Sequence, residues 1–309
     1  MKKLIATIAS IVVFASIAGA ASASDNLSGT LSLSGAWAIY PLAVKWGETF
    51  QKQHPNVKLD ISAGGAGKGM ADALSGAVDI GMVSREIDKA ERAKGAFPIF
   101  IAKDGVFATI SSNNPADRQI LKSGITKQKL LGIFINGTIT NWKQVGGPSA
   151  PIHAYTRSDA CGAGSAWAAT LGKYKQDNLK GVGVYGDPGL LEAVRRDSLG
   201  IGYNNLGYVF SGDKIAKGVY LVPIDVNHNG KADADEFIDT REKAYKAISS
   251  GAYPGARREF FVTNGKPSKL ARAFIEFALS ETGTRILEDV GGYVPLSGSE
   301  RTDQIQKIQ

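Results

Sequence analysis

The sequence predicts an α/β fold, on two observations. Segments of alternating apolar residues, as in half-buried strands, are interspersed along almost the whole chain with segments of helical apolar spacing. Glycine-rich turns join several of these strands to the helix that follows. No internal repeat or low-complexity tract stands out in the sequence, so we expect a globular chain from about Ser24 to Leu296.

The predicted elements follow one another in a regular order. Alternating apolar residues predict strands at residues 27–34, 57–61, 78–83, 98–101, 106–110, 152–155, 200–203 and 219–224. Apolar residues spaced three and four apart predict helices at residues 42–53, from 69–74 onward, 127–133, 165–173, 189–195, 240–249 and 269–287. Polar breaks at residues 111–115 and 211–214 are the expected crossings between two lobes.

The amino terminus predicts export. A basic start at residues 1–3 precedes an apolar run over residues 4–20, and small residues follow at 21–23. This pattern is typical of a secretory signal peptide over residues 1–23, cleaved between Ala23 and Ser24. The alternative, a membrane anchor that is retained, requires a longer apolar run. We therefore expect a protein of the periplasm.

Composition narrows the class of protein. The only cysteine, Cys161, cannot form an internal disulfide, and no cysteine lies near the cleavage site to carry a lipid. The formal charge is +7, or +5 without Lys2 and Lys3, and the basic residues are scattered. Scattered charge argues against nucleic acid as a partner, while a mild positive excess suits an anionic ligand.

Three glycine-rich turns each connect a predicted strand to a predicted helix. Their candidate ligand-binding residues are Gly35, Ala36 and Trp37 in the first turn, Gly65, Ala66, Gly67 and Lys68 in the second, and Arg157, Asp159, Cys161, Gly162 and Ala163 in the third. Small residues let backbone N–H groups approach an oxyanion, and the helix N-terminus adds partial positive charge. One such turn has a purely conformational explanation, but three in an α/β chain favour a ligand site.

Individual side chains in these turns have two interpretations. Arg157 can pair bidentately with an oxyanion or neutralise Asp159. Trp37 can line the site or serve only in packing, and packing is the more common role. Cys161, beside a helix N-terminus, is either a thiol of lowered pKa or a small buried apolar residue, and we favour the second.

The chain resembles the phosphate-binding branch of the type II periplasmic binding proteins of ABC transporters. The resemblance rests on residues 32–35, Tyr40-Pro41, residues 78–81, Ser84-Arg85, the turn over residues 157–164 and residues 201–208. It implies two α/β lobes, each a mixed sheet flanked by helices, joined by a two-strand hinge, with the anion in the cleft. It also implies that Asp79 accepts a hydrogen bond from a protonated phosphate and that Arg157 holds an oxygen.

The chain departs from this branch in its hydroxyl groups. The branch usually presents serine and threonine in the three turns, and this chain instead has Ala36, Trp37, Ala38, Ala66, Cys161 and Ala163. The hydroxyls of Ser34, Ser84 and Ser165 remain as possible donors. A site that lacks several hydroxyls must bind phosphate differently or hold another ligand.

The domain boundaries that we expect follow from the polar breaks and the resemblance. Residues 24–110 together with 221–309 form one lobe, and residues 111–220 form the other. The expected partner is the permease of an ABC transporter, and the expected state is a monomer.

One loop matches the twelve-residue calcium motif of EF-hands at every specified position of residues 225–236. The motif supplies the side-chain oxygens of Asp225, Asn227, Asn229, Asp233 and Glu236 and the backbone carbonyl of Lys231. A strand precedes the loop, so we expect a structural Ca²⁺ ion in a strand-loop-helix arrangement. The alternative is an acidic turn without metal.

The function predicted from the sequence is capture of a small oxyanion, with phosphate as the expected ligand. No catalytic signature accompanies Cys161, and the three histidines, His54, His153 and His228, lack metal-ligand spacing. The alternatives are a binding protein for a different ligand and a secreted hydrolase that acts on a small anionic substrate.

Overall fold

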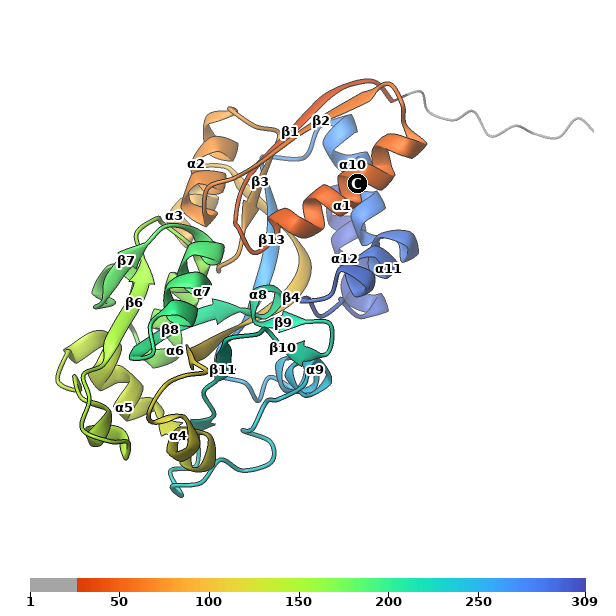
Figure 1. Cartoon of the computed structure of the whole chain (residues 1–309). Helices are drawn as coiled ribbons and strands as arrows, with labels where there is room; N and C mark the ends of the chain where they lie inside the picture. Colours follow the sequence, from red (N-terminus) through yellow and green to blue (C-terminus); the bar gives the residue numbers. More distant parts are fainter. Residues whose placement is uncertain (1–26) are drawn as a thin grey trace, which may run out of the picture.

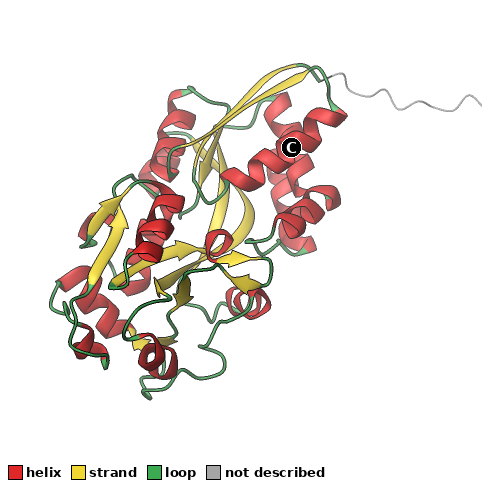
Figure 2. Cartoon of the chain, viewed as in Figure 1, coloured by secondary structure: helices red, strands yellow, loops and turns green. Residues whose placement is uncertain are grey.

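The computed structural model describes residues 27–309 (Figure 1). The predicted signal peptide and its cleavage site lie outside the described residues. The predicted α/β fold is confirmed: strands lie at the centre and helices cover them on both sides (Figure 2).

One nine-stranded sheet runs through the molecule in the order β2-β1-β3-β13-β4-β8-β6-β7, with β11 paired to β4. Its strands are β1 (Gly29–Gly35), β2 (Val57–Ala63), β3 (Ile80–Val83), β4 (Ala96–Ser111), β6 (His153–Arg157), β7 (Val182–Val184), β8 (Gly200–Asn205), β11 (Val219–Leu221) and β13 (Ala256–Asn264). Two small pairs are separate, β5 (Ile125–Thr126) with β12 (Ile224–Asp225) and β9 (Phe210–Ser211) with β10 (Lys214–Ile215). Parallel pairing of β1 with β2 and β3 brings the carboxyl ends of these strands to one edge.

The helices follow the strands in sequence. They are α1 (Tyr40–Gln53), α2 (Ala66–Ser75), α3 (Lys89–Ala93), α4 (Asp117–Ser123), α5 (Lys127–Leu131), α6 (Gly162–Leu171), α7 (Gly186–Arg196), α8 (Leu206–Val209), α9 (Arg241–Ser249), α10 (Lys269–Leu279), α11 (Glu281–Val290) and α12 (Gly298–Ile308). Short helical turns are η1 (Gly132–Asn136), η2 (Trp142–Val145) and η3 (Gln176–Asn178). No helix within residues 27–309 has both the length and the apolar character to cross a membrane.

Helix α1 shows how apolar spacing fixes the position of a helix. Leu42, Trp46 and Phe50 recur every four residues and are all buried. The indole of Trp46 donates to the carbonyl oxygen of Gly283 at 2.8 Å, which ties α1 to α11. Helices α1, α10, α11 and α12 thus cover one side of the β1–β3 region, and α2 covers the other (Figure 1).

Two hydrophobic cores define two lobes. The first core draws on residues 31–102 and 260–308, and the second draws on residues 106–253 together with Val294. Strand β4 passes from one core into the other, and β13 brings the chain back along it in antiparallel pairing. These two strands form the connection between the lobes.

The boundaries that we expected between the lobes are wrong. The break at residues 111–115 follows the long strand β4, which has already entered the second lobe, and residues 211–214 form the β9–β10 hairpin within that lobe. Residues 221–253 do not rejoin the first lobe, because Leu221, Ile224 and Ile248 pack in the second core. The chain returns only at β13.

Two other expectations also differ from the structure. Strand β4 is continuous where two strands were predicted at 98–101 and 106–110. The helix predicted over residues 269–287 is two helices, α10 and α11. Ser280 separates them because its extended backbone ends α10, and its side chain caps α11 by accepting from Gly283 N–H at 3.1 Å.

Candidate functional site

The three glycine-rich turns converge where the lobes meet. The carbonyl oxygen of Gly35 accepts the N–H groups of both Gly64 and Gly65 at 2.9 Å, which joins the first turn to the second. The N–H of Gly67 donates to the carbonyl oxygen of Ala160 in the third turn at 3.0 Å. The second and third turns belong to different lobes, so this contact spans the junction between them.

Glycine is required at the point of closest approach. Gly65 has φ +94°, and a Cβ atom there would lie 2.7 Å from the carbonyl oxygen of Ala160 and 2.9 Å from Asp159 Oδ2. Gly162, across from it, would place a Cβ against the hydroxyl of Ser84 at 2.0 Å. The lobes therefore approach each other closely enough for backbone atoms of both to contact one small ligand.

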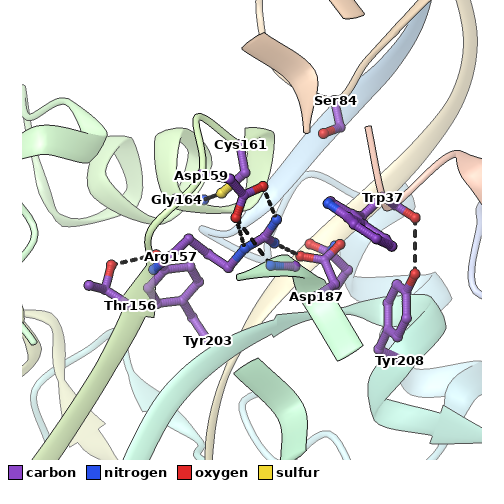
Figure 3. A network of polar contacts seen from close by, with 12 residues as sticks. Trp37, Ser84, Thr156, Arg157, Asp159, Cys161, Gly164, Asp187, Tyr203 and Tyr208 are labelled. Carbon is purple, nitrogen blue, oxygen red and sulfur yellow. Dashed lines mark hydrogen bonds and ion pairs between the residues drawn. The ribbon is translucent and has the colours of Figure 1, made fainter. Parts of the chain in front are cut away.

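Arg157 is buried at the end of β6 between two carboxylates (Figure 3). Its Nε and Nη2 donate to Asp159 Oδ1 and Oδ2 at 2.8 and 2.5 Å, and its Nη1 donates to Asp187 at the start of α7. The side chain of Arg157 is 0% exposed. Both carboxylates hold the guanidinium in one orientation, so neutralisation of Asp159, one of the two roles considered for Arg157, is confirmed.

A second buried arginine was not predicted. Arg257 on β13 donates to the carbonyl oxygen of Ser84 at 3.1 Å, to Asn205 Oδ1 at 2.7 Å and to Asp104 Oδ2 at 2.5 Å. Asn205 in turn donates to Asp187. A continuous polar network therefore connects Arg157 to the two strands that join the lobes.

Glu259 completes the buried charges near this network. It is 0% exposed, and neither carboxylate oxygen has a hydrogen-bond partner among residues 27–309, although Oε1 lies 3.2 Å from Arg257 Nε. Burial raises the pKa of Glu259 well above its ordinary value; Arg257 opposes this shift and Asp104 adds to it. We therefore expect Glu259 to hold a proton over a wide pH range.

The sequence alone gives little indication that the residues of this network are buried close together. Asp104, Asp187 and Asn205 are scattered charged or amide residues beside predicted elements. Arg257 and Glu259 lie between the helices predicted at 240–249 and 269–287, where no strand was predicted and β13 is found. Charged residues are mostly exposed, so the charges at positions 257 and 259 before an apolar run do not by themselves predict buried charge. Their mutual proximity depends on the β4–β13 and β4–β8 pairings, which the sequence did not predict.

Unpaired donors surround the junction between the turns. Within residues 27–309 no acceptor is present for the N–H groups of Trp37, Ala38, Ala66, Gly162 and Ala163. The last three open helices α2 and α6, whose N-termini carry partial positive charge. This set of donors suits an oxyanion.

Of the three remaining hydroxyls, only one is available. Ser34 donates to Asp72 at 2.6 Å and Ser165 donates to the carbonyl oxygen of Cys161 at 2.9 Å. Ser84 follows β3 and is buried, and its hydroxyl forms no hydrogen bond with the other residues drawn in Figure 3. Ser84 is therefore the hydroxyl best placed for a ligand.

Two predicted residues lie at the turns but direct their side chains elsewhere. The ammonium of Lys68 pairs with Asp72 one helical turn later in α2, so the side chain of Lys68 is engaged within its own helix. Cys161 caps α6, and its Sγ accepts the N–H of Gly164 at 3.1 Å. Burial raises the pKa of the Cys161 thiol, with Arg157 opposing the shift, which agrees with a small buried residue rather than a reactive thiolate.

Asp79 does not join the other predicted residues. It precedes β3 at the amino end of the strand, whereas the turns lie at the carboxyl ends. Its Oδ2 accepts the N–H and the hydroxyl of Ser32 at 2.8 and 2.7 Å. Asp79 is therefore left out of the candidate site.

Trp37 lies at the edge of the junction. Its ring meets Tyr185 of the second lobe edge-on, with centroids 5.8 Å apart and planes at 88°. The hydroxyl of Tyr208 donates to the carbonyl oxygen of Trp37 at 3.0 Å (Figure 3). Trp37 therefore contacts both lobes.

In the loop over residues 225–236, the carboxylate oxygens accept backbone N–H groups of the loop itself. Asp225 accepts the N–H groups of Asn229 and Gly230 at 3.1 and 3.0 Å, and Glu236 accepts those of Val226 and Asp233 at 2.7 and 3.1 Å. The helix α9 begins only at Arg241, later than a strand-loop-helix site requires. Within residues 27–309 no group of three or more His, Cys, Asp or Glu side chains is arranged to hold a metal, so a site here would depend also on amide and carbonyl oxygens.

Proteins named as phosphate-binding resemble this chain over most of its length. It is 28% identical over 283 residues to phosphate-binding protein PstS of Bacillus subtilis, covering 90% of this chain and 84% of the relative, and 28% identical over 272 residues to the protein of the same name from Borreliella burgdorferi, covering 84% and 88%. A candidate phosphate ABC transporter substrate-binding protein from Clostridium perfringens, solved with bound phosphate, has a TM-score of 0.72 at 25% identity over 87% of this chain and 100% of that one. A family described as PBP superfamily domain matches residues 20–282. The chain therefore belongs to the PBP superfamily.

Proposed function

We propose that this protein is the substrate-binding component of an ABC transporter and that it captures phosphate between its two lobes. The observation that supports this function is the set of unpaired N–H groups of three turns gathered beside the buried Arg157. Relatives that match over most of the chain are named phosphate-binding proteins, and a similar structure holds bound phosphate. The donors of this chain are mainly backbone N–H groups, which bind an oxyanion without side-chain hydroxyls.

Export to the periplasm and delivery to a membrane permease follow from this proposal. The pattern over residues 1–23 supports secretion. A binding protein that closes on its ligand presents both lobes to the permease, and a monomer suffices for this role. The mature protein then begins near Ser24.

Binding without turnover agrees better with the site than hydrolysis does. The thiol of Cys161 is held in its protonated form by burial, and its partner is a backbone N–H rather than a base. His153 pairs with Asp197 at 2.7 Å, at the opposite end of β6 from Arg157. A hydrolase would require a nucleophile beside a base, and neither residue meets that need.

The test of this function starts with mass spectrometry of any small molecule that copurifies with the protein. The stripped protein is then titrated calorimetrically with phosphate, sulfate, arsenate and molybdate. We expect one phosphate per chain, returned unchanged after release. Conversion of the ligand to a product, or heat with none of the four anions, would contradict the proposal.

We also propose that the loop over residues 225–236 binds a structural Ca²⁺ ion. The full match to the motif supports this, together with a folded loop in which Asp225 is 2% exposed and Glu236 closes the turn. At present the amide groups of Asn227 and Asn229 donate to Asp233 Oδ2, both at 2.7 Å. The Oδ1 atoms of these amides accept the N–H groups of Asn229 and Lys231 at 3.0 and 2.8 Å, so the ion would have to bind these oxygens beside the N–H groups that they already accept.

A further inference from the structure

Trp37 has a buried polar atom without a partner. Its indole Nε1 is inaccessible to solvent and makes no hydrogen bond within residues 27–309. A buried donor without an acceptor destabilises a protein, so such atoms in native structures call for an explanation. An indole N–H can only donate, and its missing partner must therefore offer an oxygen or another acceptor.

The orientation of the indole relates this atom to the anion site. Trp37 is in the first glycine-rich turn, and its nitrogen points toward the side of the site where Ser84 and the Arg157–Asp159 pair lie (Figure 3). The neighbouring backbone N–H groups of Trp37 and Ala38 also have no acceptor in the part of the chain that the structure describes. An acceptor bound beside the indole would therefore meet donors of the first turn.

Residues of the second lobe fix the ring in this orientation. Tyr185 packs edge-on against it, and a Cβ added to Gly186 would lie only 3.4 Å from the indole. Tyr208 holds the backbone of Trp37 through its carbonyl oxygen. The donor is therefore directed into the site by contacts that exist only while the lobes are together.

We propose that the indole N–H of Trp37 donates a hydrogen bond to the bound oxyanion and supplies a donor that hydroxyl groups do not provide in this chain. The proposal rests on the proposed function, since it requires an oxyanion between the lobes. It explains how a turn with Ala36 and Ala38 on either side of Trp37 still offers a side-chain donor. An indole carries no acceptor, so it faces an unprotonated oxygen and contributes equally to phosphate and sulfate.

The direct test is NMR of protein labelled with ¹⁵N at its tryptophan indoles. The chain has four tryptophans, and Trp37→Phe identifies the resonance of Trp37. Titration of stripped protein with inorganic phosphate should move the indole proton of Trp37 downfield, as a new hydrogen bond to an anion does. Trp167 is an internal control, because its Nε1 is also buried and unpaired but its ring packs between Phe134 and Tyr203.

Calorimetry supplies the second readout. Trp37→Phe keeps an aromatic ring beside Tyr185 and removes the N–H, and we expect about ten- to hundredfold weaker phosphate binding, as for loss of a hydrogen bond to a charged group. Trp167→Phe, which removes an equally unpaired N–H, should bind phosphate as the wild type does. If Trp37→Phe does not fold, the indole resonance of Trp37 is assigned in the wild-type protein from nuclear Overhauser contacts with the ring of Tyr185, and the wild-type titration then decides.

The outcomes separate this inference from the proposed function. Heat from phosphate together with an unmoved Trp37 resonance, or with equal affinity in Trp37→Phe, overturns the role of Trp37 and leaves phosphate binding intact. Absence of heat with phosphate, sulfate, arsenate and molybdate overturns both. A downfield shift confined to Trp37 with weakened binding in the variant supports the inference.

Discussion

Gly67 of the first lobe donates its backbone N–H to the carbonyl oxygen of Ala160 in the second lobe at 3.0 Å. No side chain intervenes, and a Cβ atom at Gly67 would lie 2.7 Å from the Cβ atom of Ala160. This contact requires the lobes to be together, so the structure represents a closed form. Opening of the lobes breaks it without disturbing either core.

Gly67→Ala should weaken phosphate binding without loss of thermal stability. The added methyl group overlaps Ala160 only in the closed form, and overlaps of this kind cost about 1–3 kcal/mol. Alanine is about 1 kcal/mol more favourable than glycine in a helix, so the open form of α2 does not suffer. Calorimetry and thermal unfolding measure the two effects. Gly298→Ala is the control, because no atom lies within 4 Å of the added Cβ; equal affinity in both variants would show that closure does not bring Gly67 to Ala160.

Arg157→Ala should weaken anion binding by about 1.5–3 kcal/mol, the scale of a charged hydrogen bond. It should also lower the free energy of unfolding by about 3–5 kcal/mol, because Asp159 and Asp187 remain buried without their counter-charge. Calorimetry and denaturant unfolding report the two losses separately. Asp79→Asn is the control and should leave anion affinity unchanged, because Asp79 bonds Ser32 at the other end of β3. A loss of affinity in Asp79→Asn equal to that in Arg157→Ala would place the anion elsewhere.

Asp79 and Ser84 lie at opposite ends of β3, and they show which site residues can be predicted from the sequence. The turns were found because small residues between a strand and a helix leave a recognisable local pattern. Asp79 was included by resemblance alone, although it precedes its strand while ligands collect at carboxyl ends. Ser84, which follows the same strand, fits that rule. The order of residues along one strand was thus sufficient to prefer Ser84.

The sequence does not predict which strands far apart in the chain pair with one another. The lobe boundary was misplaced because strand β4 enters both cores without a turn, and no local pattern marks the point where a strand passes between cores. The network from Arg157 to Arg257 joins residues one hundred positions apart in the chain, through Asp187 and Asn205. Only the pairing of β13, β4 and β8 brings these residues together.

Glu259→Gln should reduce the dependence of stability on pH. Burial raises the pKa of Glu259 in the folded protein above its ordinary value of 4.5, so its contribution to stability is complete below that value. As pH rises, the unfolded chain loses this proton while the folded chain keeps it, and the free energy of unfolding falls until the folded-state pKa is passed. Glutamine has a similar shape and does not titrate. Denaturant unfolding from about pH 5 to about pH 8 should therefore show a smaller decline in the variant, and an identical decline would mean that Glu259 ionises normally.

Calcium should raise the melting temperature of metal-free protein. An ion that binds only the folded state adds about 2.7 kcal/mol at a hundred times its dissociation constant, and a chelator reverses the effect. Glu236→Gln should reduce the response because it removes the carboxylate that closes the loop, while phosphate binding should persist. Lys231→Ala is the control, since the motif uses only the backbone carbonyl of Lys231. Identical melting curves with calcium and with chelator would make the loop a turn without metal.

Binding of an oxyanion where the three turns meet can be measured directly. Arsenate has the shape and charge of phosphate, and arsenic scatters anomalously, so crystals of stripped protein with arsenate locate the anion directly. We expect one anomalous peak beside Arg157, within hydrogen-bonding distance of the N–H groups of Gly162 and Ala163 and the hydroxyl of Ser84. A peak at another place, or none there at saturating arsenate, would contradict it.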